Sequence, residues 1–596
     1  MHLIETKDLM MGRTGAVPRF FANSAMGVLG INKINRLYED TFDSGADTAA
    51  DLLAELNITY TICDKDRSNI PAEGGAVFIS NHPTGLLDGI LLIDLLSRVR
   101  PDVKFMGNFL LDRIESLRRY FIPVDPFDSK DAKKNMRGVR EALRHVQNGG
   151  ALVIFPAGEV ATWHKGFNQI KDRKWPSSII RFIRSAEMPV VPICIEARNS
   201  RFFRLVGLVH PTLRTIMLPR EFLNKRDKTV NVNIGSAIAP RKVKQLEDLR
   251  VYGDYLRANV DYLHKKHPRK KLRLRRQRVP LPKTVEDIAL PVDPQLLAAE
   301  LAAIRPKHLL FEYTNYDVYC AHPDLIPSVM HEIGRLREVT FRSIGEGTMK
   351  ALDMDFYDTY YHQLFIWDRT TQQVIGAYRL GMGDEIMPRF GLKGFYVNSL
   401  FRMKKEMAHI MEKTIELGRS FIVEEYQRKP VSLMLLWKGI LYVLLKHEQY
   451  RNLLGPVTIS GEFDKYSKTV IVTHLRQHHL NRIVSRWVKP VTGLEGIDAP
   501  IDESLIAGVE DINLIDKIVR DIERDELSIP ILIKKYLQLN SHVISFNVDH
   551  DFADGLDALM LLDLKKMPES TINLLSKEIT DIDVVARFRN YHPDKS

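Results

Sequence analysis

Cysteine is scarce in this sequence, and long hydrophobic runs are missing. Among 596 residues there are three cysteines, far apart and without the spacing of metal ligands (Cys63, Cys194 and Cys320). This scarcity argues against a disulfide framework and against a zinc site, and it suits a reducing compartment. No run of about 18 or more uncharged apolar residues occurs, so we expect no membrane-spanning helix. The N-terminal stretch also lacks the continuous apolar region of a signal peptide.

The rest of the composition is that of a globular protein with more than one domain. Hydrophobic residues make up 45% and charged residues 27% of the chain, so disorder is not expected. A chain of 596 residues exceeds one ordinary domain, and two or three domains are expected from its length.

The net charge of +10 is concentrated in one segment. Residues 264–278, HKKHPRKKLRLRRQR, contain nine Lys or Arg residues and no acid. Such a run suits a solvated linker, a nucleic-acid patch or a tether to anionic lipid headgroups. Because it has no interleaved aromatic residues and no nucleic-acid motif nearby, we favour a linker or an anionic membrane surface as partner, and no nucleic acid. The most hydrophobic segment, 431–445, contains Lys438, and a core helix is favoured over one that dips into a membrane.

Strands alternate with helices in the first part of the chain, which predicts an α/β sheet domain. GAVFIS (75–80) and PVVPICIEA (189–197) have the pattern of buried strands, and LLDGILLIDLLSRV (86–99) has the apolar spacing of a helix. The second part is also mixed α/β, with a predicted hairpin at 361–381. No internal repeat links the two parts, so we interpret the chain as a fusion of two different modules.

The segment ISNHPTGLLDGI (79–90) places a histidine after a buried strand and an aspartate at the start of a helix. Imidazole, with an ordinary pKa of about 6.5, is suited to take a proton from an alcohol near neutral pH. A carboxylate on the other nitrogen of His82, here Asp88, would fix its tautomer and stabilise the imidazolium. Taken alone, the pair is better explained as a structural loop histidine and a helix cap.

Three blocks in a fixed order favour the catalytic interpretation. NHPTGLLD (81–88) is followed by FPAGE (155–159) and by MPVVPICIEA (188–197). This set resembles the lysophospholipid acyltransferase (PlsC-type) family, with its N-H-x4-D, F-P-E-G and V-P blocks. The resemblance implies a PlsC-type α/β domain in which His82 is the general base for an acceptor hydroxyl and Asp88 orients it. It also implies substrate-binding positions at Asn81, Gly85, Phe155, Pro156, Gly158 and Glu159.

Two departures from the family pattern matter. One extra residue separates His82 from Asp88, so an irregular turn through Pro83 and Gly85 must bring them together. The glutamate of the FPAGE block is displaced to Glu159, which suggests an acceptor other than a glycerol phosphate. Alternatively, Glu159 is an acid at a helix start without any acceptor role.

The downstream part resembles the GNAT-type acyltransferases that N-acylate amino acids with acyl chains from acyl-carrier protein. The resemblance implies a GNAT-like mixed α/β domain, acyl-carrier protein as partner, its phosphopantetheine thioester as acyl donor, and no bound cofactor. It covers most of 305–565 and rests on RLREVTF (335–341), VIGAYRL (374–380), IELGRSFIVEEYQRKP (415–430), LLWKGI (435–440) and LLGPVTISGEF (453–463).

Charged residues around the longest of these phrases are candidates for substrate contact. The loop EEYQRKP lacks the glycines of an acetyl-CoA pyrophosphate cradle. Arg428 and Lys429 precede a helix start, where a phosphate or an acidic partner is favoured. Glu416 and Arg419 would contact the amine and the carboxylate of an amino acid, or alternatively form an ion pair with each other.

Three further acidic features have competing interpretations. Glu338 is a candidate general base for the amine. RSIGEG (342–347) matches R-x-x-G-x-G but lies upstream of the hairpin, so we set it aside as a coincidence. NVDHDFAD (547–554) is acid-rich enough to suggest a metal, but a surface turn is favoured.

The two resemblances, in this order, are similar to the bifunctional ornithine-lipid synthases of bacteria. They imply that the C-terminal module joins a 3-hydroxyacyl chain to an amino acid, ornithine first among the candidates. The N-terminal module would then acylate the hydroxyl of that lyso-lipid, peripherally at the inner membrane on the cytoplasmic side. Alternatives are glycine or another amino acid as acceptor, a lysophospholipid or glycerophosphate at the first site, and a membrane-associated scaffold with degenerate modules.

The predicted division of the chain follows from these patterns. It comprises an amphipathic, membrane-proximal segment (1–48), the PlsC-type O-acyltransferase domain (49–264), a basic and proline-spaced linker (265–300) and the GNAT-like N-acyltransferase domain (301–590).

Overall fold

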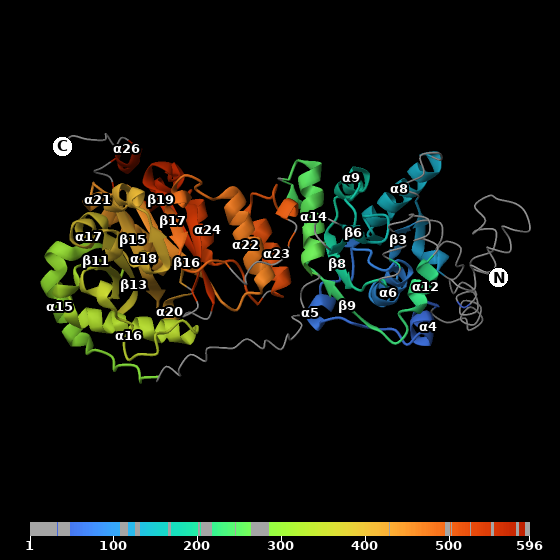
Figure 1. Cartoon of the computed structure of the whole chain (residues 1–596). Coiled ribbons are helices and arrows are strands. Elements are labelled where there is room, and N and C mark those ends of the chain that lie inside the picture. The colour runs from blue at the N-terminus through green and yellow to red at the C-terminus, as the bar shows by residue number, and fades with distance from the viewer. Residues whose placement is uncertain are drawn as a thin grey trace, which may run out of the picture. The chain divides into compact units, whose positions relative to one another are not determined.

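The architecture is that of a computed structural model of the chain (Figure 1). The basic segment 264–278, and all of the predicted segment 1–48 except residues 33 and 48, lie outside the described residues. The structure describes residues 33, 48–107, 117–124, 132–164, 169–200, 203, 217–244, 246–263, 285–427, 429–494, 501, 503–524, 526–549, 554–579 and 583–589.

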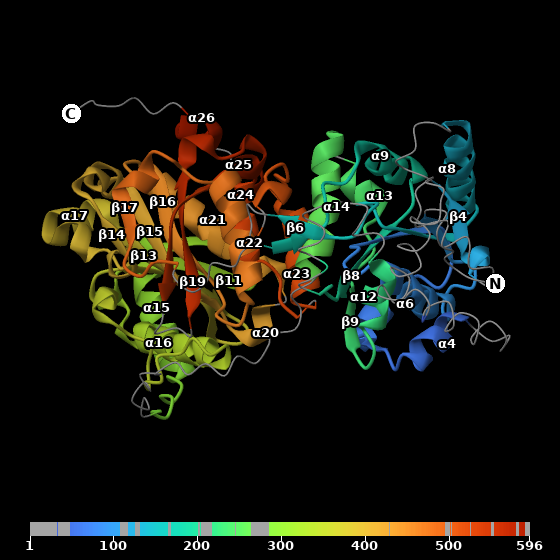
Figure 2. The same ribbon diagram turned by 45° about the vertical axis from the view of Figure 1, so that its right-hand side comes forward.

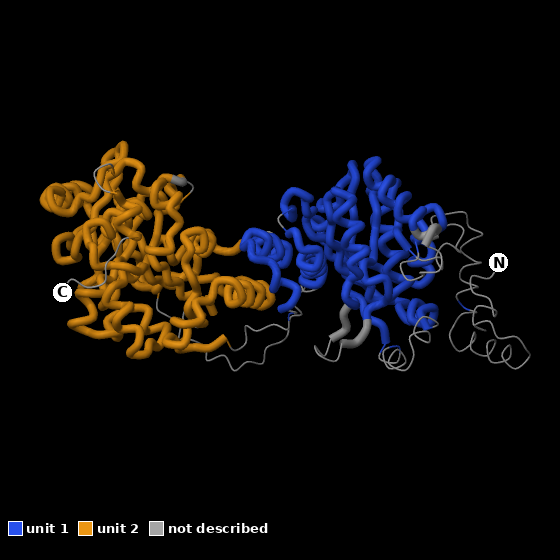
Figure 3. The backbone as a smooth tube through the Cα atoms, turned by 90° about the horizontal axis from the view of Figure 1, so that it is seen from above, with its two compact units in different colours: residues 1–269, 500–527 blue, residues 270–499, 528–596 orange. Residues whose placement is uncertain are grey.

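Two compact units make up the chain (Figure 3). The first comprises residues 1–269 and 500–527, and the second comprises residues 270–499 and 528–596. Each unit contains its own large sheet with helices. The predicted fold class, two mixed α/β domains, is therefore confirmed.

A seven-stranded sheet forms the centre of the first unit. Its order is β1 (Thr59–Thr61), β9 (Thr229–Ile234), β8 (Val190–Glu196), β2 (Ala76–Ser80), β5 (Ala151–Ile154), β3 (Lys104–Gly107), β4 (Phe121–Pro123). Neighbours run parallel except β8 and β9. β2 is buried along its whole length, as its apolar run predicts for a central parallel strand. Because β2, β5 and β8 are parallel neighbours, the loops that follow them meet at one edge of the sheet.

Helices cover both faces of this sheet (Figures 1 and 2). One side carries α4 (Thr48–Glu55), α6 (Leu86–Ser97) and α12 (Leu218–Leu223), and the other carries α8 (Ala132–Gln147), α9 (Ser177–Ala186) and α14 (Leu249–Leu263). α4 and α12 pack against α6, and α14 packs against β8 and α9. The helix α6, which directly follows the β2 loop, is buried at nearly every position.

A short segment from far downstream completes the first unit. Helix α23 (Ile512–Ile522) packs against α14. Its Asp521 accepts hydrogen bonds from the backbone N–H of Ser236 at 3.3 Å and from its hydroxyl at 3.0 Å. Lys517 donates to the Ser236 carbonyl at 3.1 Å. No pattern in the sequence predicts that this segment returns to the first unit.

The second unit contains an eight-stranded sheet. Its order is β10 (Leu309–Tyr313), β11 (Tyr316–Ala321), β12 (His362–Asp368), β13 (Gln373–Met382), β15 (Thr414–Ile422), β16 (Asn452–Ile459), β19 (Gly555–Asp563), β18 (His542–Asp549). β12 and β13 form the predicted hairpin. β15 and β16 run parallel, and their pairing ends at Glu416 and Leu454 although both strands continue. The sheet therefore opens between these two strands.

Both faces of this second sheet are covered by helices. Gln363 of β12 accepts a hydrogen bond from Arg337 of α16 (Pro327–Ser343). The next residue, Leu364, lies against Gly439 of α21 (Pro430–Lys446). Because adjacent strand residues point to opposite faces, α16 and α21 lie on opposite sides of the sheet.

The hydrophobic segment 431–445 belongs to α21 and is a core helix, as predicted. Leu435 and Leu441 are buried in the main hydrophobic cluster of the second unit. Lys438 is also buried, with its ammonium 4.6 Å from the centre of the Phe311 ring and in contact with Glu578. Within the described part of the chain, no helix is both long and apolar enough to cross a membrane.

Candidate functional site

The end of strand β2 is fixed by the side chain of Asn81. Its amide donates to the Ile195 carbonyl at 3.0 Å and accepts from the Ile195 N–H at 2.7 Å. These two bonds join the loop after β2 to strand β8. The predicted substrate-binding residue Asn81 therefore has a structural function, and it positions the residue that follows it, His82.

His82 and Asp88 meet across the turn between β2 and α6. Asp88 Oδ2 lies 3.0 Å from His82 Nδ1 as an ion-pair contact, and Nδ1 forms no hydrogen bond with the described residues. The same carboxylate accepts from the N–H groups of Thr84 and Gly85, both at 2.8 Å, and from the Thr84 hydroxyl. Gly85 has φ +91°, a left-handed conformation that reverses the chain and absorbs the extra residue.

The ring of His82 is held on its other side by Phe155. The two rings stack with centroids 4.3 Å apart and an interplanar angle of 28°. The His82 side chain is 19% exposed, whereas Asp88 is fully buried. With Nδ1 facing Asp88, Nε2 is the nitrogen left to accept a proton from a bound hydroxyl.

Asp172 is a further residue at this site, and the sequence does not predict it. The His82 N–H donates to Asp172 Oδ1 at 3.2 Å across 90 residues of chain. Asp172 is 4% exposed, and Arg257 donates to its backbone carbonyl at 2.9 Å. Burial, together with the neighbouring Asp261 carboxylate, raises the pKa of Asp172 to about 7. No local motif in the sequence distinguishes this aspartate from a surface acid.

The FPAGE block forms a turn after β5, beside His82. The Gly158 N–H donates to the Phe155 carbonyl at 2.9 Å, and Pro156 is buried. Glu159 is partly exposed and forms a 2.8 Å ion pair with Arg173. The next element is strand β6 (Thr162–His164), so the interpretation of Glu159 as a helix-start acid is wrong.

The second unit contains a cavity of about 280 Å³ where β15 and β16 separate. Arg419 lies on its wall, at an irregularity in the pairing of β15 with β13, and has φ +46°. The cavity is lined by Phe341, Ile344, Glu346, Tyr378, Tyr396, Leu400, Leu417, Gly418, Arg419, Ser420, Pro456, Val457, Thr458, Pro530, Leu532, Tyr536, Asp549 and Asp557.

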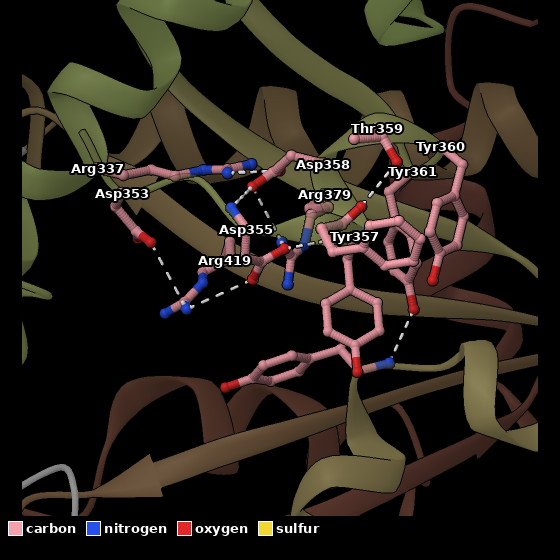
Figure 4. Close-up of polar contacts among 12 residues, drawn as sticks. Arg337, Asp353, Asp355, Tyr357, Asp358, Thr359, Tyr360, Tyr361, Arg379 and Arg419 are labelled. Atoms are coloured by element: carbon pink, nitrogen blue, oxygen red, sulfur yellow. Dashed lines mark hydrogen bonds and ion pairs between the residues drawn. The ribbon is translucent and has the colours of Figure 1, made fainter.

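Arg419 is only loosely held by its neighbours (Figure 4). Its Nη2 lies 3.6 Å from Asp353 Oδ1 and 3.8 Å from Asp355 Oδ2. Its Nε is buried and receives no partner among the described residues. The guanidinium therefore retains hydrogen-bonding capacity for an anionic group that enters the cavity.

A buried ion-pair network lies behind Arg419 (Figure 4). Arg337 donates to Asp358 at 2.8 Å, and Arg379 donates to Asp355 at 2.6 Å and lies 3.2 Å from Asp358. The rings of three tyrosines surround the Arg379 guanidinium at 5.2 to 5.6 Å from their centres (Tyr357, Tyr361 and Tyr396). Because Asp355 contacts both Arg379 and Arg419, this network holds the Asp355 carboxylate next to Arg419.

Glu416 and Arg419 do not pair with each other, so the alternative of a mutual ion pair is wrong. Glu416 is fully buried, where it accepts from the Tyr361 hydroxyl at 2.8 Å and from the Val397 N–H at 3.1 Å. Burial raises the pKa of Glu416 to about 7. Glu416 is not among the residues that line the cavity.

Glu338 also lies away from the cavity lining, and its carboxylate is fully engaged. It accepts from Arg342 at 2.8 Å, from the Thr348 N–H and hydroxyl at 3.0 and 2.7 Å, and from the Met349 N–H at 2.9 Å. Although burial alone would raise the pKa of Glu338, these bonds hold it below its ordinary value. Glu338 therefore has a structural role, because its hydrogen bonds join α16 to the loop that follows it.

The basic residues before α21 are only partly described. Arg428 lies outside the described residues. Lys429 precedes the first turn of α21, and its ammonium lies 3.8 Å from the centre of the Tyr426 ring. Their interaction with a phosphate or an acidic partner remains a prediction.

Three acids line the cavity, and sequence analysis gave none of them a substrate-binding or catalytic role. Glu346 belongs to RSIGEG, which was set aside as a coincidence and whose Ile344 and Glu346 contribute to the wall. Asp549 belongs to the acid-rich stretch 547–554, and Asp557 follows it on β19. No group of acids, histidines and cysteines suited to a metal ion occurs among the residues that the structure describes.

Two family models match the chain in the order of its two units. A model described as an acyltransferase matches residues 48–270, and one described as an acetyltransferase (GNAT) domain matches residues 336–438. The chain is therefore an acyltransferase with an N-terminal acyltransferase domain and a C-terminal GNAT-type domain.

Curated relatives of two kinds are similar to this chain. A glycine N(alpha)-acyltransferase of Bacteroides thetaiotaomicron is 28% identical over 329 residues, which is 52% of this chain and 93% of the relative. The glycine N(alpha)-acyltransferase of Phocaeicola vulgatus is 26% identical over 306 residues, 48% of this chain and 91% of the relative. A lyso-glycine lipid O-acyltransferase of Phocaeicola vulgatus is 26% identical over 252 residues, 40% of this chain and 86% of the relative.

Proposed function

We propose that this acyltransferase makes a diacylated aminolipid in two steps, one in each unit. The GNAT-type domain N-acylates an amino acid with a 3-hydroxyacyl chain, and the N-terminal domain O-acylates the hydroxyl of that lyso-lipid. The observation that carries the proposal is the His82–Asp88 contact of 3.0 Å in a chain that also contains a GNAT-type cavity. The two kinds of relatives, which act on glycine and on a lyso-glycine lipid by their names, support this combination.

In the O-acylation step, His82 Nε2 takes the proton of the lyso-lipid hydroxyl as its oxygen attacks the thioester carbonyl. Asp88 stabilises the imidazolium that forms, and the stacked Phe155 keeps the ring in place. The backbone N–H groups at the start of α6 would stabilise the negative charge that develops on the carbonyl oxygen. The thiolate of the donor then leaves, and the hydroxyl proton returns from His82 to its sulfur.

In the N-acylation step, the separated strands β15 and β16 would hold the donor thioester, and Arg419 would bind the carboxylate of the amino acid. We propose acyl-carrier protein as the source of the thioester, because Lys429 and Arg428 precede a helix start suited to its phosphate or its acidic surface. Because the intermediate is itself a lipid, we also propose peripheral attachment to the inner membrane.

Ornithine is our first candidate for the amino acid. Three carboxylates and one guanidinium line the cavity (Glu346, Asp549, Asp557 and Arg419). An acceptor with two ammonium groups and one carboxylate complements this charge better than glycine does. Glycine is the second candidate, favoured by the names of the relatives.

The test is expression of the full chain in a bacterial host that makes no aminolipid, followed by mass spectrometry of the lipid extract. We expect a diacylated aminolipid from the wild type, whose headgroup fragment identifies the amino acid. H82A should accumulate the mono-acylated lipid. H331A, which removes an exposed histidine of α16, should match the wild type. Absence of any aminolipid from the wild type would favour the scaffold alternative instead.

A further inference from the structure

Asp557 lies in a polar row across the second sheet. On strand β19 it faces Thr458 of β16 on one side and Asn547 of β18 on the other. The residue is only 3% exposed. A buried carboxylate has a large desolvation cost unless its oxygens are paired.

One of the two carboxylate oxygens of Asp557 has a partner. The Thr458 hydroxyl donates to Oδ1 at 2.8 Å. Oδ2 is buried and has no partner with hydrogen-bond geometry among the described residues, although the side chain of Asn547 also lowers the pKa of the carboxylate. Because Asp557 lines the cavity, its carboxylate retains an unpaired oxygen for a donor that binds there.

The two buried acids predicted from the sequence do not offer such an oxygen to the cavity. Glu338 holds four hydrogen bonds, and Glu416 holds Tyr361 and the Val397 amide. Neither residue belongs to the cavity wall.

The charged and titratable groups that face Asp557 come from three directions. Asp549 lies on the neighbouring strand β18, and Glu346 lies on the loop after α16. Arg419 of β15 and Tyr396 lie on the same cavity wall. The cavity therefore combines an excess of carboxylate with a single guanidinium, an arrangement that suits an ammonium group near Asp557 and a carboxylate near Arg419.

We propose that Asp557 is the catalytic base of N-acylation, with its Oδ2 binding the acceptor ammonium and taking one proton from it. This inference rests on the proposed function, because it requires that the cavity binds the amine of an amino acid.

The ammonium group transfers one proton to Asp557, and the freed lone pair attacks the thioester carbonyl carbon, so that a C–N bond forms. The nitrogen then loses a second proton, the C–S bond breaks, and the departing thiolate takes up that proton. The proton on Asp557 passes to solvent, which leaves an amide and a free thiol.

The environment of Asp557 also suits a base that works near neutral pH. Burial raises the pKa of Asp557 to about 6, against the lowering effect of the Thr458 hydrogen bond. The carboxylate is thus ionised at neutral pH, while its affinity for a proton is higher than that of an exposed aspartate.

The first test compares D557N with D563N in the purified full chain. The acceptors are L-ornithine and glycine, the donor is a 3-hydroxyacyl thioester of acyl-carrier protein, and thiol release is measured from pH 5 to pH 9. D557N should lower kcat/KM at pH 7 by about 100-fold or more. Its residual activity should rise about tenfold per pH unit, because the free amine then forms in solution. Asp563, at the far end of the same strand, caps a short helix, and D563N should retain wild-type activity.

The second test does not depend on the folding of D557N. T458V leaves the carboxylate in place but removes the hydrogen bond that lowers the pKa of Asp557. The acidic limb of the kcat/KM profile should therefore shift to higher pH in T458V. A merely structural role of Asp557 would leave the position of this limb unchanged.

The outcomes separate the base from the proposed function. If the wild type acylates neither acceptor, the proposed function fails. If the wild type is active and D557N keeps its full rate, or T458V keeps the wild-type limb, Asp557 is not the base although the function stands. A loss in D557N that is equal at every pH would also overturn the assignment.

Discussion

Asp88 Oδ2 lies 3.0 Å from Nδ1 of His82, although the sequence places one residue more between them than the family spacing does. The contact exists because Gly85 adopts φ +91° and lets Asp88 turn back over the loop. Asp88 then accepts hydrogen bonds from Thr84 and Gly85 and orients His82 at the same time. The carboxylate is both the cap of α6 and the partner of the candidate base.

D88N should abolish most of the O-acylation. The amide cannot stabilise an imidazolium as a carboxylate does, so we expect a loss of about 100-fold or more in the O-acylation rate. Stability should fall by about 1–3 kcal/mol, because two buried N–H groups lose a charged acceptor. The measurements are lyso-lipid acylation by the purified chain and its chemical unfolding.

D64N is the matched control for D88N, since Asp64 is an exposed acid of the same unit. It should change neither property. Full O-acylation by D88N would remove Asp88 from the mechanism.

G85A should impair the same site through the backbone. A Cβ at this position would lie 2.9 Å from Leu218 Cδ2 and 3.2 Å from Val160 Cγ2, in addition to the strain of positive φ. Gly74 has φ +82° and an open space around it. G74A should therefore lower the free energy of unfolding by the backbone strain alone, about 1 kcal/mol. We expect G85A to lose clearly more stability than G74A, and to lose O-acylation. Equal effects of the two variants would contradict the crowding at Gly85.

Sequence patterns predicted the parts of the first site that are local in the chain. His82, Asp88 and the FPAGE turn belong to short blocks at the ends of apolar strands, so their positions follow from strand order. Asp172 could not be predicted, because its role depends on a contact with a backbone amide 90 residues away. In the second unit, the phrase IELGRSF predicts a strand that carries Arg419, and that residue lies on β15 in the cavity wall. No sequence pattern points to Asp557, because only the register of β16, β18 and β19 places it in the cavity wall.

Asp172 should make the stability of the first unit depend on pH. Its pKa is about 7 in the folded chain and 3.8 ordinarily. Between these values the folded state holds a proton that the unfolded state has lost, so this group lowers stability as pH rises from about 4 to about 7. D172N removes the titration but retains an acceptor for the His82 amide. The stability of D172N minus that of wild type should therefore be larger at pH 8 than at pH 5.

Thermal unfolding of both proteins at the two pH values measures this difference. The nearby charges, Asp261 and Arg257, are the same in both proteins and cancel to first order. An equal difference between D172N and wild type at pH 5 and pH 8 would show that Asp172 does not titrate in this range.

The segment 500–527 should support O-acylation although it lies in the second half of the sequence. Ile515 of α23 is fully buried, and α23 packs against α14 of the first unit. I515A should cost about 2–4 kcal/mol and lower the temperature at which O-acylation is lost, with little effect on N-acylation. I531A, at a 59% exposed isoleucine of the second unit, is the control. Loss of N-acylation instead of O-acylation in I515A would show that segment 500–527 stabilises the second unit and would contradict this prediction.

R419Q should separate binding of the acceptor carboxylate from the chemistry. The contacts of Arg419 with Asp353 and Asp355 are 3.6 and 3.8 Å long, so the guanidinium is available for a bidentate carboxylate. Its loss should raise KM for the amino acid about 10- to 100-fold, in line with about 1.5–3 kcal/mol for hydrogen bonds to a charged group. An amine that lacks the carboxylate, such as putrescine in place of ornithine, should be acylated equally by R419Q and wild type.

The control is R402Q, which changes an exposed arginine of β14 (Phe401–Met403) and should leave acylation of both acceptors unchanged. If R419Q lowers the rate with putrescine as much as with ornithine, Arg419 does not recognise the carboxylate, and the acceptor must lie in the cavity in another orientation.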